Sequence, residues 1–107
     1  MKLRSNFIAG SQQAQANRAA HLEALQQIAD AAELASLGGG ETARARHLGR
    51  GKMLPRDRVA GLLDPGSAFL EIGATAAHGL YGRAAPGAGL IAGVGRVMGR
   101  DVMVVCN

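Results

Sequence analysis

The 107 residues suffice for one small domain or for part of a larger one. Aromatic residues make up only 3% of the chain, which argues against a stacking surface for single-stranded nucleic acid, and one cysteine excludes a disulfide framework. No apolar run approaches the ~20 residues that a membrane span needs. The net charge of +4 favours a phosphate-bearing partner: a nucleic acid, a nucleotide-containing cofactor or an anionic membrane.

The N-terminal third predicts one long helix over residues 11–37, after a loose lead-in over residues 1–10. The segment contains no proline and is rich in Ala, Gln, Glu and Leu, and Ser11 can act as its N-cap. An apolar stripe follows helical spacing through Leu22, Leu25, Ile28, Ala29, Ala32 and Ala35. Such a helix would be roughly 40 Å long. We therefore expect its stripe to be poorly covered within this chain.

Glycines, basic residues and two short helices are expected next. Gly38, Gly39 and Gly40 end the long helix, since glycine adopts the left-handed conformation that a helix C-terminus requires. A second helix is expected over about residues 41–48. Pro55 opens a third at the position where its missing N–H costs nothing. That helix has an apolar face formed by Val59, Leu62 and Leu63. The sequence DPGS at residues 64–67 is a turn signature.

The C-terminal part indicates β-structure. Three strands are expected, over residues 68–74, 90–97 and 102–106. A loop rich in glycine and alanine occupies residues 76–89, and residues 98–101 are typical of a hairpin turn. Gly93 and Gly95 interrupt the second strand, where glycine allows bending or close approach of another segment. Cys106 is expected to act as a small buried hydrophobic residue.

Motifs for catalysis and metal binding are weak. Gly51-Lys52 resembles the end of a P-loop, but Arg46 stands at the required glycine position and Met53 at the Ser/Thr position. Residues 87–92 fit a relaxed GxGxxA pattern, yet a strand follows them where a dinucleotide-binding fold needs a helix. The three histidines lack paired metal-ligand spacing: His21, His47 and His78. We therefore assign no catalytic residue and no metal site.

The basic segment, which we define as residues 44–52, carries the densest positive charge. Its side chains are Arg44, Arg46, His47, Arg50 and Lys52. Composition leaves two interpretations open, namely a solvated or ion-paired surface and an anion site. In an anion site, glycine lets backbone N–H groups face the anion, and arginine holds phosphate through two parallel hydrogen bonds.

Three portions of the sequence, RHLGRGKMLPRDRV, LLDPGS and PGAGLIAGVGRV, resemble the N-terminal part of acyl-CoA carboxyltransferase subunits. The similarity covers residues 17–107. It is strongest to the non-biotin (beta) subunit of the methylcrotonoyl-CoA carboxylases, then the geranyl-CoA type, and is more distant from the propionyl-CoA type. The resemblance implies an α/β, crotonase-like fold preceded by a long helix. Residues 1–37 would then be the lead-in and helix, and residues 38–107 the start of the first carboxyltransferase domain, truncated at 107.

The resemblance also implies a function, that of the carboxyltransferase component of a biotin-dependent ligase. Carboxyl would pass from carboxybiotin to a branched unsaturated acyl-CoA such as 3-methylcrotonoyl-CoA. Biotin would be carried by a partner subunit that contains the biotin carboxylase and carrier domains. The CoA thioester would bind this domain, with Arg46, His47, Arg50 and Lys52 as candidate CoA-binding residues. The family's oxyanion-hole loops would follow residue 107, so the 107 residues alone are expected to be inactive.

The same resemblance implies a homo-oligomer with neither nucleic acid nor membrane as its partner. It would reside in the bacterial cytoplasm, or in the mitochondrial matrix of a eukaryote. Two alternatives from other classes stay open at this point: a small basic nucleic-acid-binding protein and a helical interaction module. Retention on CoA compared with retention on DNA at matched salt would separate the carboxyltransferase from the first of them.

Overall fold

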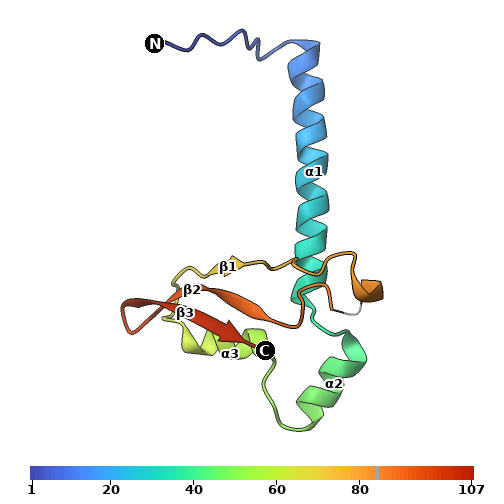
Figure 1. Ribbon diagram of the computed structural model, residues 1–107, viewed down its shortest axis with the longest axis vertical. Helices are drawn as coiled ribbons and strands as arrows, with labels where there is room; N and C mark the ends of the chain where they lie inside the picture. The colour runs from blue at the N-terminus through green and yellow to red at the C-terminus, as the bar shows by residue number, and fades with distance from the viewer. Residues whose placement is uncertain (84) are drawn as a thin grey trace. The chain divides into compact units, whose positions relative to one another are not determined.

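The computed structural model describes residues 1–83 and 85–107, so Ala84 of the expected loop lies outside the described residues. Its elements in chain order are α1 (Gln12–Ser36), α2 (Glu41–Gly49), α3 (Pro55–Leu62), β1 (Leu70–Ile72), a 3-10 turn (Tyr81–Arg83), β2 (Ile91–Val97) and β3 (Arg100–Cys106), as Figure 1 shows. The chain divides into two compact units, residues 1–30 and 31–107. A long helix and a small sheet agree with the expected α/β class. Among the described helices, none is long and apolar enough to cross a membrane.

Helix α1 confirms the expected N-terminal helix within one residue at each end. The Ser11 hydroxyl accepts a hydrogen bond from the Ala14 N–H at 3.1 Å, which is the expected N-cap. Along the helix the stripe residues Leu22, Leu25 and Ile28 are 51%, 60% and 63% exposed. The stripe is therefore poorly covered at these three residues, as expected, whereas Ala35 at its end is buried.

The three strands form one antiparallel sheet in the order β1-β2-β3. The second and third strands are long, whereas β1 has only three residues of the expected seven-residue strand. The β2–β3 ladder runs through to the pair Val97–Arg100, so the connecting loop is the two residues Met98 and Gly99 and not the expected four. Both have positive φ, 51° and 75°, which matches the right-handed twist of the flanking strands.

Helix α3 covers one face of this sheet, and the contact forms the core. Val59 of α3, Ile91 of β2 and Val104 of β3 are buried together. The side chains packed against them are Leu63, Phe69, Val102 and Cys106. Leu62, expected on the same apolar face, is exposed. Leu63, the extended residue that follows the last residue of α3, packs against the core instead.

The strand glycines are explained by this packing. A Cβ atom on Gly93 would lie 2.6 Å from the Phe69 ring, and one on Gly95 would lie 3.2 Å from the same ring. Real Cβ atoms do not approach another carbon at the first of these distances. The expectation that these glycines permit close approach is confirmed. The neighbours that approach are the Leu70 carbonyl and the Phe69 ring at Gly93, and the Leu63 side chain and the same ring at Gly95.

Asp64 joins the turn after α3 to the β2–β3 hairpin. Its carboxylate accepts hydrogen bonds from the N–H groups of Met98 and Gly99, at 2.6 and 2.8 Å. Its own N–H donates to the carbonyl of Arg96 at 2.8 Å. The expected turn is also present, since the N–H and hydroxyl of Ser67 both donate to the Asp64 carbonyl. The DPGS sequence is therefore both a local turn and a long-range clamp.

The opposite face of the sheet carries exposed aliphatic side chains. In one cross-strand row Val94 lies between Leu70 and Met103. In the next row Ala92 lies between Ile72 and Val105. The four outer residues of these rows are all more than half exposed. Within the described residues, the sheet packs on one face only.

Candidate functional site

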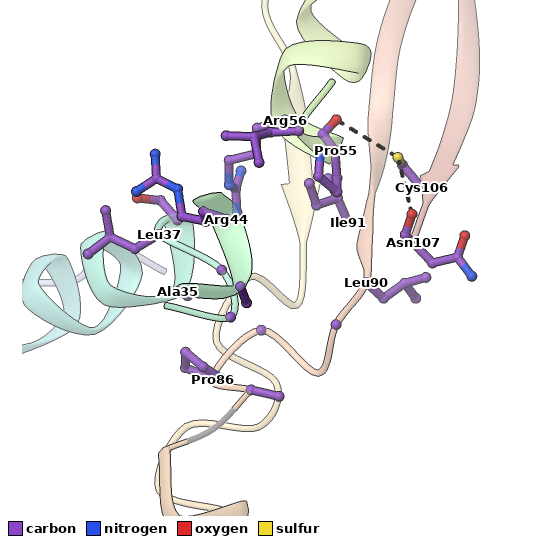
Figure 2. Close-up of a pocket in the computed structure, with 18 of the residues that line it drawn as sticks. Ala35, Leu37, Arg44, Pro55, Arg56, Pro86, Leu90, Ile91, Cys106 and Asn107 are labelled. Atoms are coloured by element: carbon purple, nitrogen blue, oxygen red, sulfur yellow. Dashed lines mark hydrogen bonds between the residues drawn. The ribbon is translucent and has the colours of Figure 1, made fainter. Parts of the chain in front are cut away.

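A cavity of about 600 Å³ lies in the second unit (Figure 2). Its wall is formed by the end of α1 and the glycines that follow, one side of α2, the start of α3, the loop before β2, and the end of β3. Most of these side chains are apolar, including Ala35, Leu54, Pro86 and Ile91. The cavity is thus large enough for part of an organic ligand, and its body would contact that ligand through apolar atoms.

Two arginines supply the positive charge of this wall. Arg56 pairs with Glu71 of β1 through two parallel hydrogen bonds of 2.8 and 2.9 Å. The hydrogen bond to Glu71 raises the pKa of Arg56 above its ordinary value. This guanidinium is therefore already occupied in joining α3 to the sheet. Arg44 of α2 lines the same cavity and is half-buried, and no carboxylate of the described residues forms a salt bridge with it.

Sequence reasoning missed the Arg56–Glu71 pair. The available signal was Glu71 itself, an acidic residue placed between two aliphatic residues of a short strand. Leu70 and Ile72 face the exposed side of the sheet, so strand alternation places Glu71 on the side that packs against α3, where a carboxylate needs a cationic partner. The partner lies 15 residues earlier, and only the fold brings it there.

Helix α2 positions most of the basic segment. Its N-cap is Gly40 with φ of 87°, a backbone conformation that glycine adopts readily. The first turn contains Glu41, and the last turn contains Arg46 and His47. Both placements complement the helix dipole. The helix ends where Gly51 takes φ of 71° and donates its N–H to the carbonyl of Leu48 at 2.9 Å.

The four candidate CoA-binding residues do not occupy one environment. Arg46, Arg50 and Lys52 are exposed and lie outside the cavity lining. His47 is half-buried, lines the cavity, and bonds through Nε2 to the carbonyl oxygen of Met53 at 2.8 Å. We call Arg46, Arg50 and Lys52 the three outward cations, in contrast to the imidazole of His47, which lines the cavity.

Two backbone N–H groups of the basic segment are already bonded within the chain. Glycine was expected to turn backbone N–H groups of this segment toward an anion. The N–H of Arg50 instead donates to the carbonyl of His47 at 3.3 Å, and that of Gly51 to Leu48. These two groups are used by the C-terminus of α2, because the last carbonyls of a helix need donors. Neither of these two N–H groups is therefore free to bind an anion.

Cys106 lies where the end of β3 meets the start of α3. Its Sγ is 3.8 Å from the carbonyl oxygen of Pro55, as the dashed line in Figure 2 shows. It is half-buried and packs against the core, so the expected hydrophobic role is confirmed only in part. His21 and His78 are both exposed. Within residues 1–83 and 85–107, no three His, Cys, Asp or Glu side chains gather as metal ligands.

Comparison with known proteins shows the family to which the chain belongs. Residues 46–107, more than half of the chain, match the model of the carboxyl transferase domain. The chain belongs to the carboxyl transferase domain family. The matched part of this carboxyl transferase chain begins in α2 and includes α3 and the whole sheet.

A relative from Mycobacterium tuberculosis is the beta1 subunit of the biotin-dependent 3-methylcrotonyl-coenzyme A carboxylase. It is 60% identical over 73 residues, which are 68% of this chain and 14% of the relative. This confirms the resemblance to methylcrotonoyl-CoA carboxylase beta subunits. It also favours the carboxyltransferase interpretation over nucleic-acid binding. Other relatives include mitochondrial proteins.

Two solved structures share the fold. The beta subunit of geranyl-CoA carboxylase from P. aeruginosa has a TM-score of 0.66 and 33% identity, and covers 96% of this chain and 19% of that one. Transcarboxylase 12S, solved with hydrolysed methylmalonyl-coenzyme A bound, has a TM-score of 0.65 and 33% identity over 78% of this chain and 17% of that one. The chain therefore spans less than one fifth of the length of these relatives.

Proposed function

We propose that this chain contributes to the carboxyltransferase subunit of a biotin-dependent acyl-CoA carboxylase. The observation that carries the proposal is the 60% identity to a 3-methylcrotonyl-coenzyme A carboxylase subunit, within a region that matches the carboxyl transferase domain. Residues 38–107 would belong to the first, crotonase-like carboxyltransferase domain, and residues 1–37 would precede it. The substrate would be a branched unsaturated acyl-CoA such as 3-methylcrotonoyl-CoA.

Carboxybiotin, carried by a partner subunit, supplies the carboxyl group in this reaction. The contribution of this chain is to bind the CoA portion of the acceptor. CoA ends in a pyrophosphate and a ribose 3′-phosphate, so its recognition needs several cations within reach of one another. The three outward cations Arg46, Arg50 and Lys52 meet that need, because they stand two to four residues apart and are exposed. None of them forms a salt bridge with a described carboxylate.

The proposed assembly follows from the same family. A biotin carboxylase and carrier subunit would be the partner, and the carboxyltransferase subunit would form a homo-oligomer. Support comes from transcarboxylase 12S, which was solved as a hexamer. The protein would work in the cytoplasm of a bacterium or in the mitochondrial matrix of a eukaryote, in keeping with its bacterial and mitochondrial relatives.

A titration with CoA tests the proposal on the chain itself. Single substitutions Arg46→Ala, Arg50→Ala and Lys52→Ala remove one charge each from the outward set. A charge-assisted hydrogen bond is worth roughly 1.5–3 kcal/mol, so each is expected to weaken CoA binding about tenfold or more. Arg18→Ala removes an exposed charge from α1 and is the matched control, with no expected effect.

Salt and DNA complete this experiment. Binding of CoA through exposed phosphate contacts should weaken as salt increases. Retention on duplex DNA at matched salt, without retention on CoA, would favour the nucleic-acid-binding alternative. Unchanged CoA affinity in all three alanine variants would mean that Arg46, Arg50 and Lys52 form a solvated surface and not an anion site.

A further inference from the structure

His47 stands apart from the other side chains of the basic segment. It is half-buried, whereas Arg46, Arg50 and Lys52 are exposed. Its imidazole is also already bonded, with Nε2 lying 2.8 Å from the carbonyl oxygen of Met53, six residues later. A carbonyl oxygen only accepts hydrogen bonds, so Nε2 must carry the proton. Both the neutral Nε2–H tautomer and the imidazolium can make this bond.

The Met53 carbonyl accepts no hydrogen bond from the backbone of α3. The carbonyl of Leu54, the next residue, accepts the Arg58 N–H at 3.0 Å as the first bond of α3. The Met53 carbonyl precedes that ladder by one residue. Pro55 holds Leu54 in the extended conformation, with ψ of 149°, so the chain cannot continue the helix backward. Among the described residues, His47 is the partner of this carbonyl.

This bond closes a loop that is fixed at its other end as well. At the start of the loop, the N–H groups of Arg50 and Gly51 bond to the carbonyls of His47 and Leu48. At its end, the His47 ring holds Met53. The residues between these two attachments carry two of the three outward cations. His47 thus joins the last turn of α2 to the residue just ahead of α3.

We propose that His47 is a positioning residue, which holds the loop of residues 50–53 closed so that Arg50 and Lys52 are presented together to an anion. It does this through Met53 and does not itself contact the phosphate. The inference rests on the proposed CoA-binding function and revises the direct role first expected for His47. A loop closed in advance loses less conformational freedom on binding than an open one, so closure strengthens the binding of the anion.

Two amide substitutions separate positioning from direct contact. In His47→Gln the side-chain nitrogen reaches the position of Nε2 and can donate to Met53. In His47→Asn the side chain is one methylene shorter, so its nitrogen reaches only the position of Nδ1. Neither amide can become a cation. Both variants keep a polar, uncharged side chain on α2, and thermal melting checks that each remains folded to the same degree.

Trypsin reports on the loop without any ligand, since it cleaves after Arg50 and Lys52. We expect cleavage at these two bonds to be several-fold faster in His47→Asn than in the wild type, and close to wild type in His47→Gln. Titration with CoA should follow the same order. The affinity should fall by about two- to tenfold in His47→Asn, the range of one net hydrogen bond, and stay unchanged in His47→Gln.

The outcomes distinguish a positioning role of His47 from direct contact with the phosphate. Equal loss of CoA affinity in both variants, with unchanged cleavage, would mean that His47 contacts the phosphate directly and would overturn the positioning role. Unchanged cleavage and affinity in His47→Asn would overturn it too. If the wild type does not bind CoA while the cleavage difference is present, the loop closure stands and the proposed function fails.

Discussion

Replacing Asp64 is the sharpest test of how the sheet is held. Met98 has φ of 51°, which a residue with a side chain rarely adopts, and its N–H is bound by the Asp64 carboxylate. Asp64→Ala removes two charge-assisted hydrogen bonds, those from Met98 and Gly99. Each such bond contributes about 1.5–3 kcal/mol when it is shielded from solvent. The hairpin is exposed, so water can bond to the freed N–H groups and recover part of this energy. We expect a loss of about 2 kcal/mol in the free energy of unfolding, and about 1 kcal/mol for Asp64→Asn, whose amide keeps one acceptor.

Urea denaturation, monitored by circular dichroism, measures this loss in the free energy of unfolding. For a chain of this size, 2 kcal/mol corresponds to a decrease of about 10 °C in Tm. Asp101→Asn is the matched control on the same hairpin. Asp101 forms only the exposed 3.1 Å ion pair with Arg96, so its loss should cost less than about 0.5 kcal/mol. Equal effects of the two substitutions, or no effect of Asp64→Ala, would refute the clamp.

Two further substitutions test the packing between α3 and the sheet. Gly93→Ala places a Cβ atom 2.6 Å from the Phe69 ring, and we expect overpacking to cost about 1–3 kcal/mol in the same denaturation assay. The control is Gly61→Ala in α3, whose Cβ atom meets open space and should raise the free energy of unfolding by up to about 1 kcal/mol. A stabilising effect of Gly93→Ala would contradict the observed packing. Arg56→Lys keeps the charge but loses the bidentate geometry to Glu71, with an expected cost of about 1 kcal/mol. Arg96→Lys, at an exposed pair, should be near neutral, and equal costs at the two sites would argue against the Arg56–Glu71 link.

The helices could be predicted from the sequence because their signals are local. Ser11, Gly38 and Pro55 mark helix ends through the conformations and hydrogen bonds of single residues, and each stands at the expected end. The hairpin position was also predictable, although its length was not. A four-residue loop over residues 98–101 would pair Val97 with Val102, whereas the structure pairs Val97 with Arg100. The carboxylate that binds the two loop residues comes from Asp64, which is 34 residues away from Met98.

The candidate site was predicted less completely, for the same reason. The sequence shows that positive charges are dense over residues 44–52, but not which of them face outward. That direction is set by α2, whose C-terminus uses the nearby N–H groups and whose His47 turns back toward Met53. The cavity is formed by residues from three separate parts of the chain, within 35–57, 85–91 and 106–107, so no local pattern could have indicated it.

The sequence portions that identify the family mostly stabilise the fold. LLDPGS supplies Asp64, which bonds to the hairpin, and the two glycines of GVG leave room for the Phe69 ring against β2. LPRDRV opens α3 at Pro55 and supplies the arginine that pairs with Glu71. Only RHLGRGK combines a structural bond with outward cations. Similarity in these portions is therefore first of all evidence that the fold is shared. The proposed link to CoA depends on Arg46, Arg50 and Lys52, whose substitution should alter binding while leaving the other three portions, and so the fold, intact.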